Sequence, residues 1–369
     1  MSKPVSLIEL FYDLVFVYML SQATELIREL EKGAVPITSL GVFIFIVIVF
    51  INSWMIQTIF TNRYGQSSWT DIAFFFVDMM IVLYMSNSFS TDLNANLQPF
   101  YFAAGLLSLT LFMQYMIIDL QTKTVQDRQI AQAFGTILGI RTVTFFTAGT
   151  LPRFEGLLVA LIGIGISWIA PSLTGKYTRQ HPVIFSHLLE RLTELTIVVF
   201  GETIVGIAGY FTKASFSITS VFIFLIVASL FFAYITEFDH LIDEKRQGET
   251  GNLLIYLHYP IIFGISMMTV ALRFVAEPDV NHLFAVSFLY TGFALMYFGL
   301  WVARTYNQPR YRQRDHLFVL ISGIIAVAYF ASLKVQQFSV IILISALATM
   351  ICCIGMVSQI YRYQNLDVG

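Results

Sequence analysis

Residues 37–61 read ITSLGVFIFIVIVFINSWMIQTIFT, a run of 25 residues without a charged side chain. About 20 consecutive apolar residues suffice for a helix to cross the hydrocarbon core of a bilayer, which is about 30 Å thick. Water is absent there, so the backbone has to satisfy its hydrogen bonds internally, and a single apolar segment does so as a helix. This stretch therefore predicts a membrane-spanning helix.

Similar apolar runs recur along the chain. The sequence predicts spans at 10–30, 37–61, 69–88, 98–120, 129–150, 155–174, 186–210, 216–237, 251–274, 282–304, 315–333 and 337–360. The fifth run is the least apolar because it holds Gln129, Gln132 and Arg141. A half-inserted fifth helix, which would leave eleven spans, is the alternative. The predicted fold class is an all-α, polytopic helical membrane protein with about twelve spans.

Composition agrees with a bilayer as the solvent. Hydrophobic residues make up 57% of the chain and charged residues 12%, whereas an average soluble domain has roughly 25% charged residues. The net charge of −2 and the absence of a basic cluster exclude a nucleic-acid partner. The sequence holds no phosphate-binding loop, no dinucleotide-binding glycine pattern, no HExxH and no CxxC, so no cofactor is evident and a metal is left open.

Two segments indicate an internal repeat. ELFYDLVFVYMLSQATELI begins at Glu9 and ERLTELTIVVFGETIVGIA begins at Glu190, and each carries two carboxylates four residues apart. An even number of helices separates them, which gives two halves in parallel orientation about an axis along the membrane normal. We therefore predict two six-helix repeats, residues 1–180 and 181–369.

Lysine and arginine are distributed unequally between the two sides. The connections that share a face with the N-terminus hold roughly twice as many of them as the opposite side. The positive-inside rule then predicts a multi-pass protein of the cytoplasmic membrane with both termini in the cytoplasm. The expected partners are the lipid bilayer and a small ion or solute, and a homo-oligomer is left open.

The acidic residues of the paired segments are the first candidates for function. If the halves pack about their axis, Glu9, Asp13, Glu190 and Glu194 converge near the cytoplasmic side, where they could bind a cation or share protons. The alternative is that they pair with one of the basic residues Arg63, Arg179 and Arg191, or complement helix N-terminal dipoles.

Four further charged or titratable residues lie deeper in the predicted spans. Glu202 lies twelve residues beyond Glu190, about 18 Å along a helix. Asp78 and Arg141 could form a structural ion pair with each other or with Glu202. His258 precedes Pro260, which interrupts a helix and frees a carbonyl, as in many ion pathways, although a histidine–tyrosine hydrogen bond would explain the residue equally well.

Several motifs resemble a known family. ELFYDLVFV at residues 9–17, Trp54 with Thr58 and Asn62-Arg63-Tyr64, Glu190-Arg191, Gly201-Glu202-Thr203 and His258-Tyr259-Pro260 stand in the order of the bacterial low temperature requirement A (LtrA) family. The resemblance covers nearly the whole chain. It implies a bacterial inner-membrane protein connected with growth in the cold, and it implies no substrate or reaction.

Three functions stay open at this point. The first is a secondary transporter or channel for an ion or small solute, with coupling through Asp13, Glu194 and Glu202. The second is a membrane-embedded enzyme or lipid-handling protein in cold adaptation of the envelope, using acids and His258. The third is a membrane sensor without transport.

Overall fold

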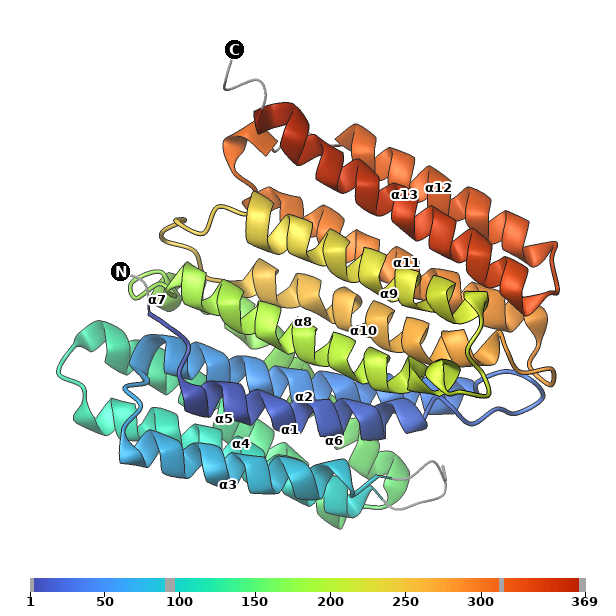
Figure 1. Cartoon of the computed structure of the whole chain (residues 1–369). Helices are drawn as coiled ribbons and strands as arrows, with labels where there is room; N and C mark the ends of the chain where they lie inside the picture. Colours follow the sequence, from blue (N-terminus) through green and yellow to red (C-terminus); the bar gives the residue numbers. More distant parts are fainter. Residues whose placement is uncertain (1–2, 90–96, 312–314, 365–369) are drawn as a thin grey trace. The chain divides into compact units, whose positions relative to one another are not determined.

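The structure is a computed structural model that describes residues 3–89, 97–311 and 315–364. The described residues form helices and connections, with two isolated β-bridges and no strand. The helices are α1 (Leu7–Glu25), α2 (Ile37–Tyr64), α3 (Trp69–Ser86), α4 (Gln98–Gln121), α5 (Val125–Thr150), α6 (Arg153–Leu173), α7 (Gly175–Thr178), α8 (Phe185–Ile207), α9 (Ile218–Ile235), α10 (Asn252–Phe274), α11 (His282–Ala303), α12 (Asp315–Leu333) and α13 (Phe338–Gln364). Figure 1 shows their order along the chain. The predicted all-α fold is confirmed.

Twelve helices in the described part of the chain are long and apolar enough to cross a membrane. All of the long helices qualify, and only the four-residue helix α7 is left out. The fifth of these, Val125–Thr150, has 26 residues and is a candidate span by its length and composition, and whether it is half-inserted stays open. The first helix begins at Leu7, earlier than predicted, because Ser6 and Glu9 form a capping box at its start.

The chain divides into two compact units. The first holds Met1–Glu29, Ile37–Leu195 and Lys245–Ile255, and the second holds Leu30–Pro36, Thr196–Glu244 and Tyr256–Gly369. These units are compact regions in space and are not the predicted sequence repeats. The two repeats, residues 1–180 and 181–369, are inferred from sequence similarity and stay a prediction.

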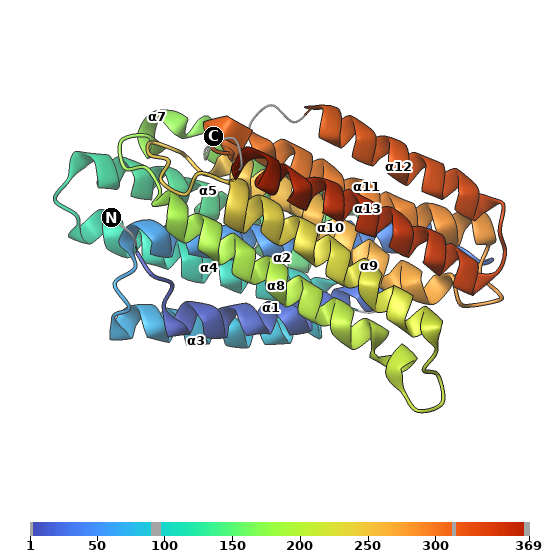
Figure 2. The ribbon, with the colours of Figure 1, turned by 45° about the horizontal axis from the view of Figure 1, so that its top comes forward.

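In the first unit α2 is the central helix. It packs against α1, α4 and α6, and α3 packs against α1 and α4. Figure 2 shows α1 and α3 side by side in this unit. Every residue of α2 from Val49 to Asn62 is buried, including six polar side chains: Asn52, Ser53, Gln57, Thr58, Thr61 and Asn62. A polar stretch inside an apolar bundle needs partners from neighbouring helices.

In the second unit α13 packs against α9 and α12, and α12 packs against α11. α9 continues into a π-helical turn, Thr236–Leu241. Helices α10 and α11 approach closely at two glycines, since a Cβ on Gly264 would lie 2.6 Å from the carbonyl oxygen of Gly292. Small residues of this kind allow close packing of membrane helices.

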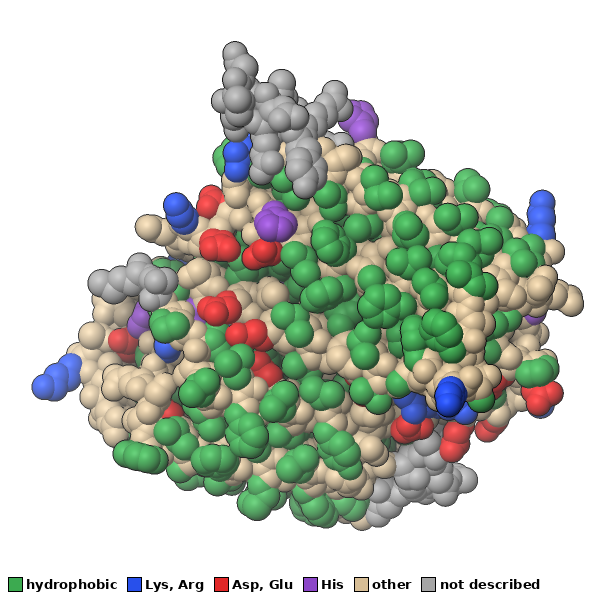
Figure 3. Space-filling model, in the orientation of Figure 1, with side chains coloured by type: hydrophobic (Ala, Val, Ile, Leu, Met, Phe, Trp, Pro, Cys, Tyr) green, Lys and Arg blue, Asp and Glu red, His purple; other side chains and the backbone are tan. Residues whose placement is uncertain are grey.

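The surface has the character expected of a membrane protein. Many large hydrophobic side chains are exposed, among them Phe76, Val143, Val205, Val319 and Phe330. On the face seen in Figure 3, hydrophobic side chains cover the middle, and the visible lysine and arginine side chains lie towards the helix ends. Lipid tails are the natural neighbours of such a surface.

Candidate functional site

The start of α1 places Glu9 at the edge of the first unit's polar interior. One carboxylate oxygen of Glu9 accepts hydrogen bonds from the Ser6 backbone nitrogen at 2.9 Å and from the Ser6 hydroxyl at 2.8 Å. These bonds satisfy donors that a helix start would otherwise leave unpaired. The side chain is 3% exposed, so its other oxygen, Oε1, faces inward.

One turn further along α1, Asp13 is held by Arg191 of α8. The guanidinium donates to both carboxylate oxygens, with Nη1 2.6 Å from Oδ2 and Nη2 2.8 Å from Oδ1. Trp54 of α2 donates its indole N–H to Oδ1 at 2.7 Å, and the guanidinium carbon lies 5.1 Å from the centre of the Trp54 ring. This paired geometry is the strong form of an arginine–carboxylate contact.

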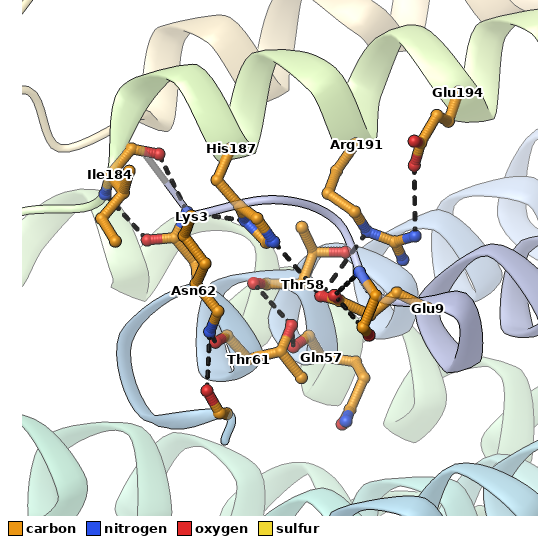
Figure 4. A network of polar contacts seen from close by, with 12 residues as sticks. Lys3, Glu9, Gln57, Thr58, Thr61, Asn62, Ile184, His187, Arg191 and Glu194 are labelled. Atoms are coloured by element: carbon orange, nitrogen blue, oxygen red, sulfur yellow. Dashed lines mark hydrogen bonds and ion pairs between the residues drawn. The ribbon is translucent and has the colours of Figure 1, made fainter. Parts of the chain in front are cut away.

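Arg191 also faces two more carboxylates. Its Nη1 lies 3.5 Å from Oε2 of Glu194, and its Nε lies 4.0 Å from Oε1 of Glu9. We call Glu9, Asp13, Glu194, His187 and Arg191 the acid cluster. Most of these side chains are labelled in Figure 4, where His187, Arg191 and Glu194 project from the same face of α8.

His187 is oriented by Asn62 at the end of α2. The Asn62 amide donates to the Ile184 carbonyl at 2.9 Å and accepts from the Ile184 nitrogen at 2.8 Å, so its orientation is fixed by the backbone before α8 (Figure 4). The same amide nitrogen lies 3.0 Å from His187 Nδ1 and can only donate there. The ring hydrogen therefore sits on Nε2, which lies 3.4 Å from Glu9 Oε1.

Lys3 joins the segment before α1 to the end of α2. Its ammonium group donates to the Gly65 carbonyl at 2.7 Å and to the Thr61 carbonyl. Burial lowers the pKa of Lys3, and the charges of Glu9 and Asp71 oppose that effect. Lys3 therefore lies at the end of the first unit's polar interior where α1 begins and α2 ends.

Asp78 and Arg141 are both fully buried in the first unit, but they do not form the ion pair considered from the sequence. Arg141 donates to Asn52 Oδ1 at 2.8 Å and to the Ser53 hydroxyl, and Ser167 of α6 lies beside them. Asp78 accepts from the Thr110 hydroxyl of α4 and has no lysine, arginine or histidine within 4.0 Å in the part of the chain that the structure describes.

The other predicted residues lie elsewhere. Glu190 is exposed on α8, and Arg63 donates to the His181 carbonyl at 3.0 Å. Glu202, 4% exposed, belongs to the second unit and follows Gly201, which is exposed. His258 lies two residues before Pro260 inside α10, and its Nε2 lies 3.1 Å from the hydroxyl of Tyr234. This contact is the histidine–tyrosine hydrogen bond considered from the sequence, and a role of His258 in an ion pathway stays a prediction.

Sequence reasoning missed several members of these networks. Examples are His187, the Gln57–Gln114 amide pair, whose two N–H···O distances are 3.2 and 3.1 Å, and Thr110. It also missed Glu237, which is fully buried in the π-helical turn and accepts from Asn307 at 2.6 Å. Each is a polar residue inside a predicted span, and this position could have identified it as a candidate from the sequence.

An apolar cavity of 930 Å³ lies between α11 and α12 of the second unit. Its lining includes Tyr290, Phe298, Trp301, Phe318 and Tyr329. The few polar groups there are hydroxyls, and the Ser287 and Tyr329 oxygens lie 3.0 Å apart. A cavity of this character suits a hydrocarbon chain and not a hydrated ion.

The comparisons with known proteins agree with the motifs quoted above. No curated protein and no solved structure matches the chain. Residues 4–355 match the family described as bacterial low temperature requirement A protein (LtrA). Because this match covers nearly the whole chain and includes the acid cluster, the protein belongs to the bacterial LtrA family of multi-pass membrane proteins.

Proposed function

We propose that the chain is a secondary transporter or channel for an ion or small solute, and that intramembrane carboxylates carry the coupling or conducted ion. The observation behind this proposal is the charge balance of the acid cluster, where one guanidinium faces three carboxylates within the spans. An unpaired charge in a membrane span costs several kcal/mol. The excess negative charge is therefore a reason for the cluster to take up a cation or a proton.

Glu194 is the member that exchanges this charge in our proposal. Asp13 has a paired contact with Arg191 and a third bond from Trp54, and Glu9 is held by Ser6 and faces His187. Glu194 has only the 3.5 Å contact with Arg191, and its side chain is 19% exposed. It is thus the least fixed and most accessible carboxylate of the three.

Flux through purified protein in liposomes tests the proposal. Gradients of K⁺, Na⁺, H⁺ and Cl⁻ are imposed in turn, with empty liposomes as the reference. We expect a cation or proton flux above the reference for the wild type and its loss in Glu194→Gln. Absence of flux under every gradient, with correctly inserted protein, would contradict transport of these ions.

A second candidate is lipid handling, which the cavity between α11 and α12 favours. On α11 the lining runs from Ser287 to Trp301, about 21 Å of helix. One leaflet contributes about half of a 30 Å core, or about 15 Å, so the lined stretch of α11 is long enough for an acyl chain to lie along it. The Arg304 guanidinium lies 5.2 Å from the Trp301 ring and would place a positive charge near the end of such a chain.

Ala294→Trp fills the cavity and distinguishes this candidate from transport. If the protein handles lipid there, phospholipid that stays bound through detergent purification decreases in Ala294→Trp, and the lipid composition of cells that rely on this variant changes. Equal lipid retention by the wild type and Ala294→Trp, measured by mass spectrometry, would remove the candidate.

A further inference from the structure

Asp78 is buried inside the first unit. It is the tenth residue of the 18-residue helix α3, and its side chain is fully buried where α3 packs against α1 and α4. Nine residues from the start of a helix correspond to about 14 Å of depth. The carboxyl group is therefore near the middle of the span, the most costly place for a charge.

Its surroundings are polar but uncharged. One carboxyl oxygen, Oδ1, accepts a hydrogen bond from the Thr110 hydroxyl of α4. The other oxygen, Oδ2, is buried and has no hydrogen-bond partner in the described part of the chain. An ionised carboxylate at this place would have one oxygen without any compensation.

Thr110 accommodates both protonation states of this carboxyl group. Its hydroxyl has one hydrogen and two neighbouring acceptors, Asp78 Oδ1 and the Leu107 carbonyl, the latter at 2.8 Å. When Asp78 is ionised, Thr110 donates to Oδ1. When Asp78 is protonated on Oδ1, that proton is donated to the threonine oxygen, and the threonine hydrogen turns to Leu107. No other atom has to move.

Tyr12 connects this place with the acid cluster. Its hydroxyl is buried without a hydrogen-bond partner among the described residues, and its ring packs edge-on against Phe75, 5.0 Å between centroids. Phe75 lies one turn before Asp78 on α3, and Tyr12 directly precedes Asp13 on α1.

We propose that Asp78 is a proton-exchange site and that H⁺ is the ion it carries, an inference that rests on the proposed transport function. Thr110 of α4 contacts the carboxyl group, and Tyr12 of α1 packs against Phe75, one turn before Asp78 on α3. In the exchange, the O–H bond of the acid breaks and its proton passes to a water molecule, which becomes hydronium. The reverse step restores the neutral acid.

Infrared difference spectroscopy of the purified protein in lipid nanodiscs tests the proposal without any transport assay. A change of pH converts a protonated carboxyl into a carboxylate, so the carbonyl band of the acid disappears as the carboxylate bands rise. We expect such a band in the wild type and in Asp71→Asn, a control on the same helix, and its loss in Asp78→Asn. A wild type without it, or Asp78→Asn with the wild-type band, would overturn the proposal.

Thr110→Val keeps the test decisive if Asp78→Asn does not fold. This variant retains shape and removes the hydroxyl that accepts from the protonated acid. We expect the carbonyl band to shift to higher frequency, because a carboxyl O–H without an acceptor has a stiffer C=O bond. An unshifted band would assign it to another acid and contradict the inference. Failure of the transport function appears separately, as absence of flux in liposomes while the Asp78 band persists.

Discussion

Arg191 is the residue on which the acid cluster depends. It contacts three carboxylates and the Trp54 ring while being 1% exposed. Buried ion pairs contribute little net stability relative to apolar residues of the same volume, but removing one partner leaves a buried charge without compensation. The arginine therefore fixes where the acids lie more than it stabilises the fold as a whole.

This difference predicts a non-additive pair of substitutions. Arg191→Gln should lower the free energy of unfolding by about 3–5 kcal/mol, because Asp13 is left buried and unpaired. The double variant Asp13→Asn with Arg191→Gln should be more stable than the sum of the single changes predicts. Unfolding with dodecyl sulfate, followed by tryptophan fluorescence, measures each value. Additive effects would show that the two side chains do not interact.

Asn62 gives a second prediction at this scale. Asn62→Ala removes the bonds to both backbone groups of Ile184 and to His187, and should cost about 1–3 kcal/mol. The control is Gln180→Ala, which removes an exposed amide in the connection before α8. It should change the free energy of unfolding by less than about 0.5 kcal/mol. In Asn62→Asp the donor to Nδ1 is lost, so nitrogen NMR should show His187 leaving the Nε2–H tautomer. An unchanged tautomer would contradict the assignment.

At the scale of helices, the close approach of α10 and α11 depends on two glycines. A Cβ at Gly292 would lie 2.8 Å from the Gly264 carbonyl oxygen and 3.0 Å from the Met268 nitrogen, both of them backbone atoms that cannot turn aside. A Cβ at Gly323 of α12 would meet nothing within 4 Å. The two positions form a matched pair for substitution.

We expect Gly292→Ala to destabilise the protein by about 1–3 kcal/mol, because the two helices have to separate. Gly323→Ala should be neutral or slightly stabilising, since alanine is the better helix former by about 1 kcal/mol. Thermal unfolding in detergent compares the two variants. Equal stability of both would mean that α10 and α11 do not touch at this point.

The helices could be predicted from the sequence, and the site only in part. The second span was predicted as 37–61 and is Ile37–Tyr64, because apolar length depends on local sequence alone. The acids of the first span were identified by the cost of a charge in a membrane. Their partners were not: Arg63 and Arg179 were equal alternatives to Arg191, and only the packing of α8 against α1 and α2 selects among them.

At the scale of the whole molecule, the spans and the lysine and arginine distribution predict cytoplasmic N- and C-termini. A green fluorescent protein fused after Gly369 should fluoresce, and alkaline phosphatase inserted in the connection near Lys213 should be active. The fluorescent protein fluoresces only in the cytoplasm, and the phosphatase is active only on the opposite side of the membrane. An active phosphatase fused after Gly369 would reverse the orientation.

The proposal that this molecule moves an ion through its carboxylates is tested most directly by one flux comparison in liposomes. Wild type, Glu194→Gln and Glu155→Gln, an exposed control at the start of α6, are reconstituted side by side with a pH-sensitive dye inside. We predict a cation- or proton-driven change of internal pH in the wild type and Glu155→Gln that is at least tenfold slower in Glu194→Gln. Equal rates in all three proteins, or rates no faster than in empty liposomes, would contradict the account.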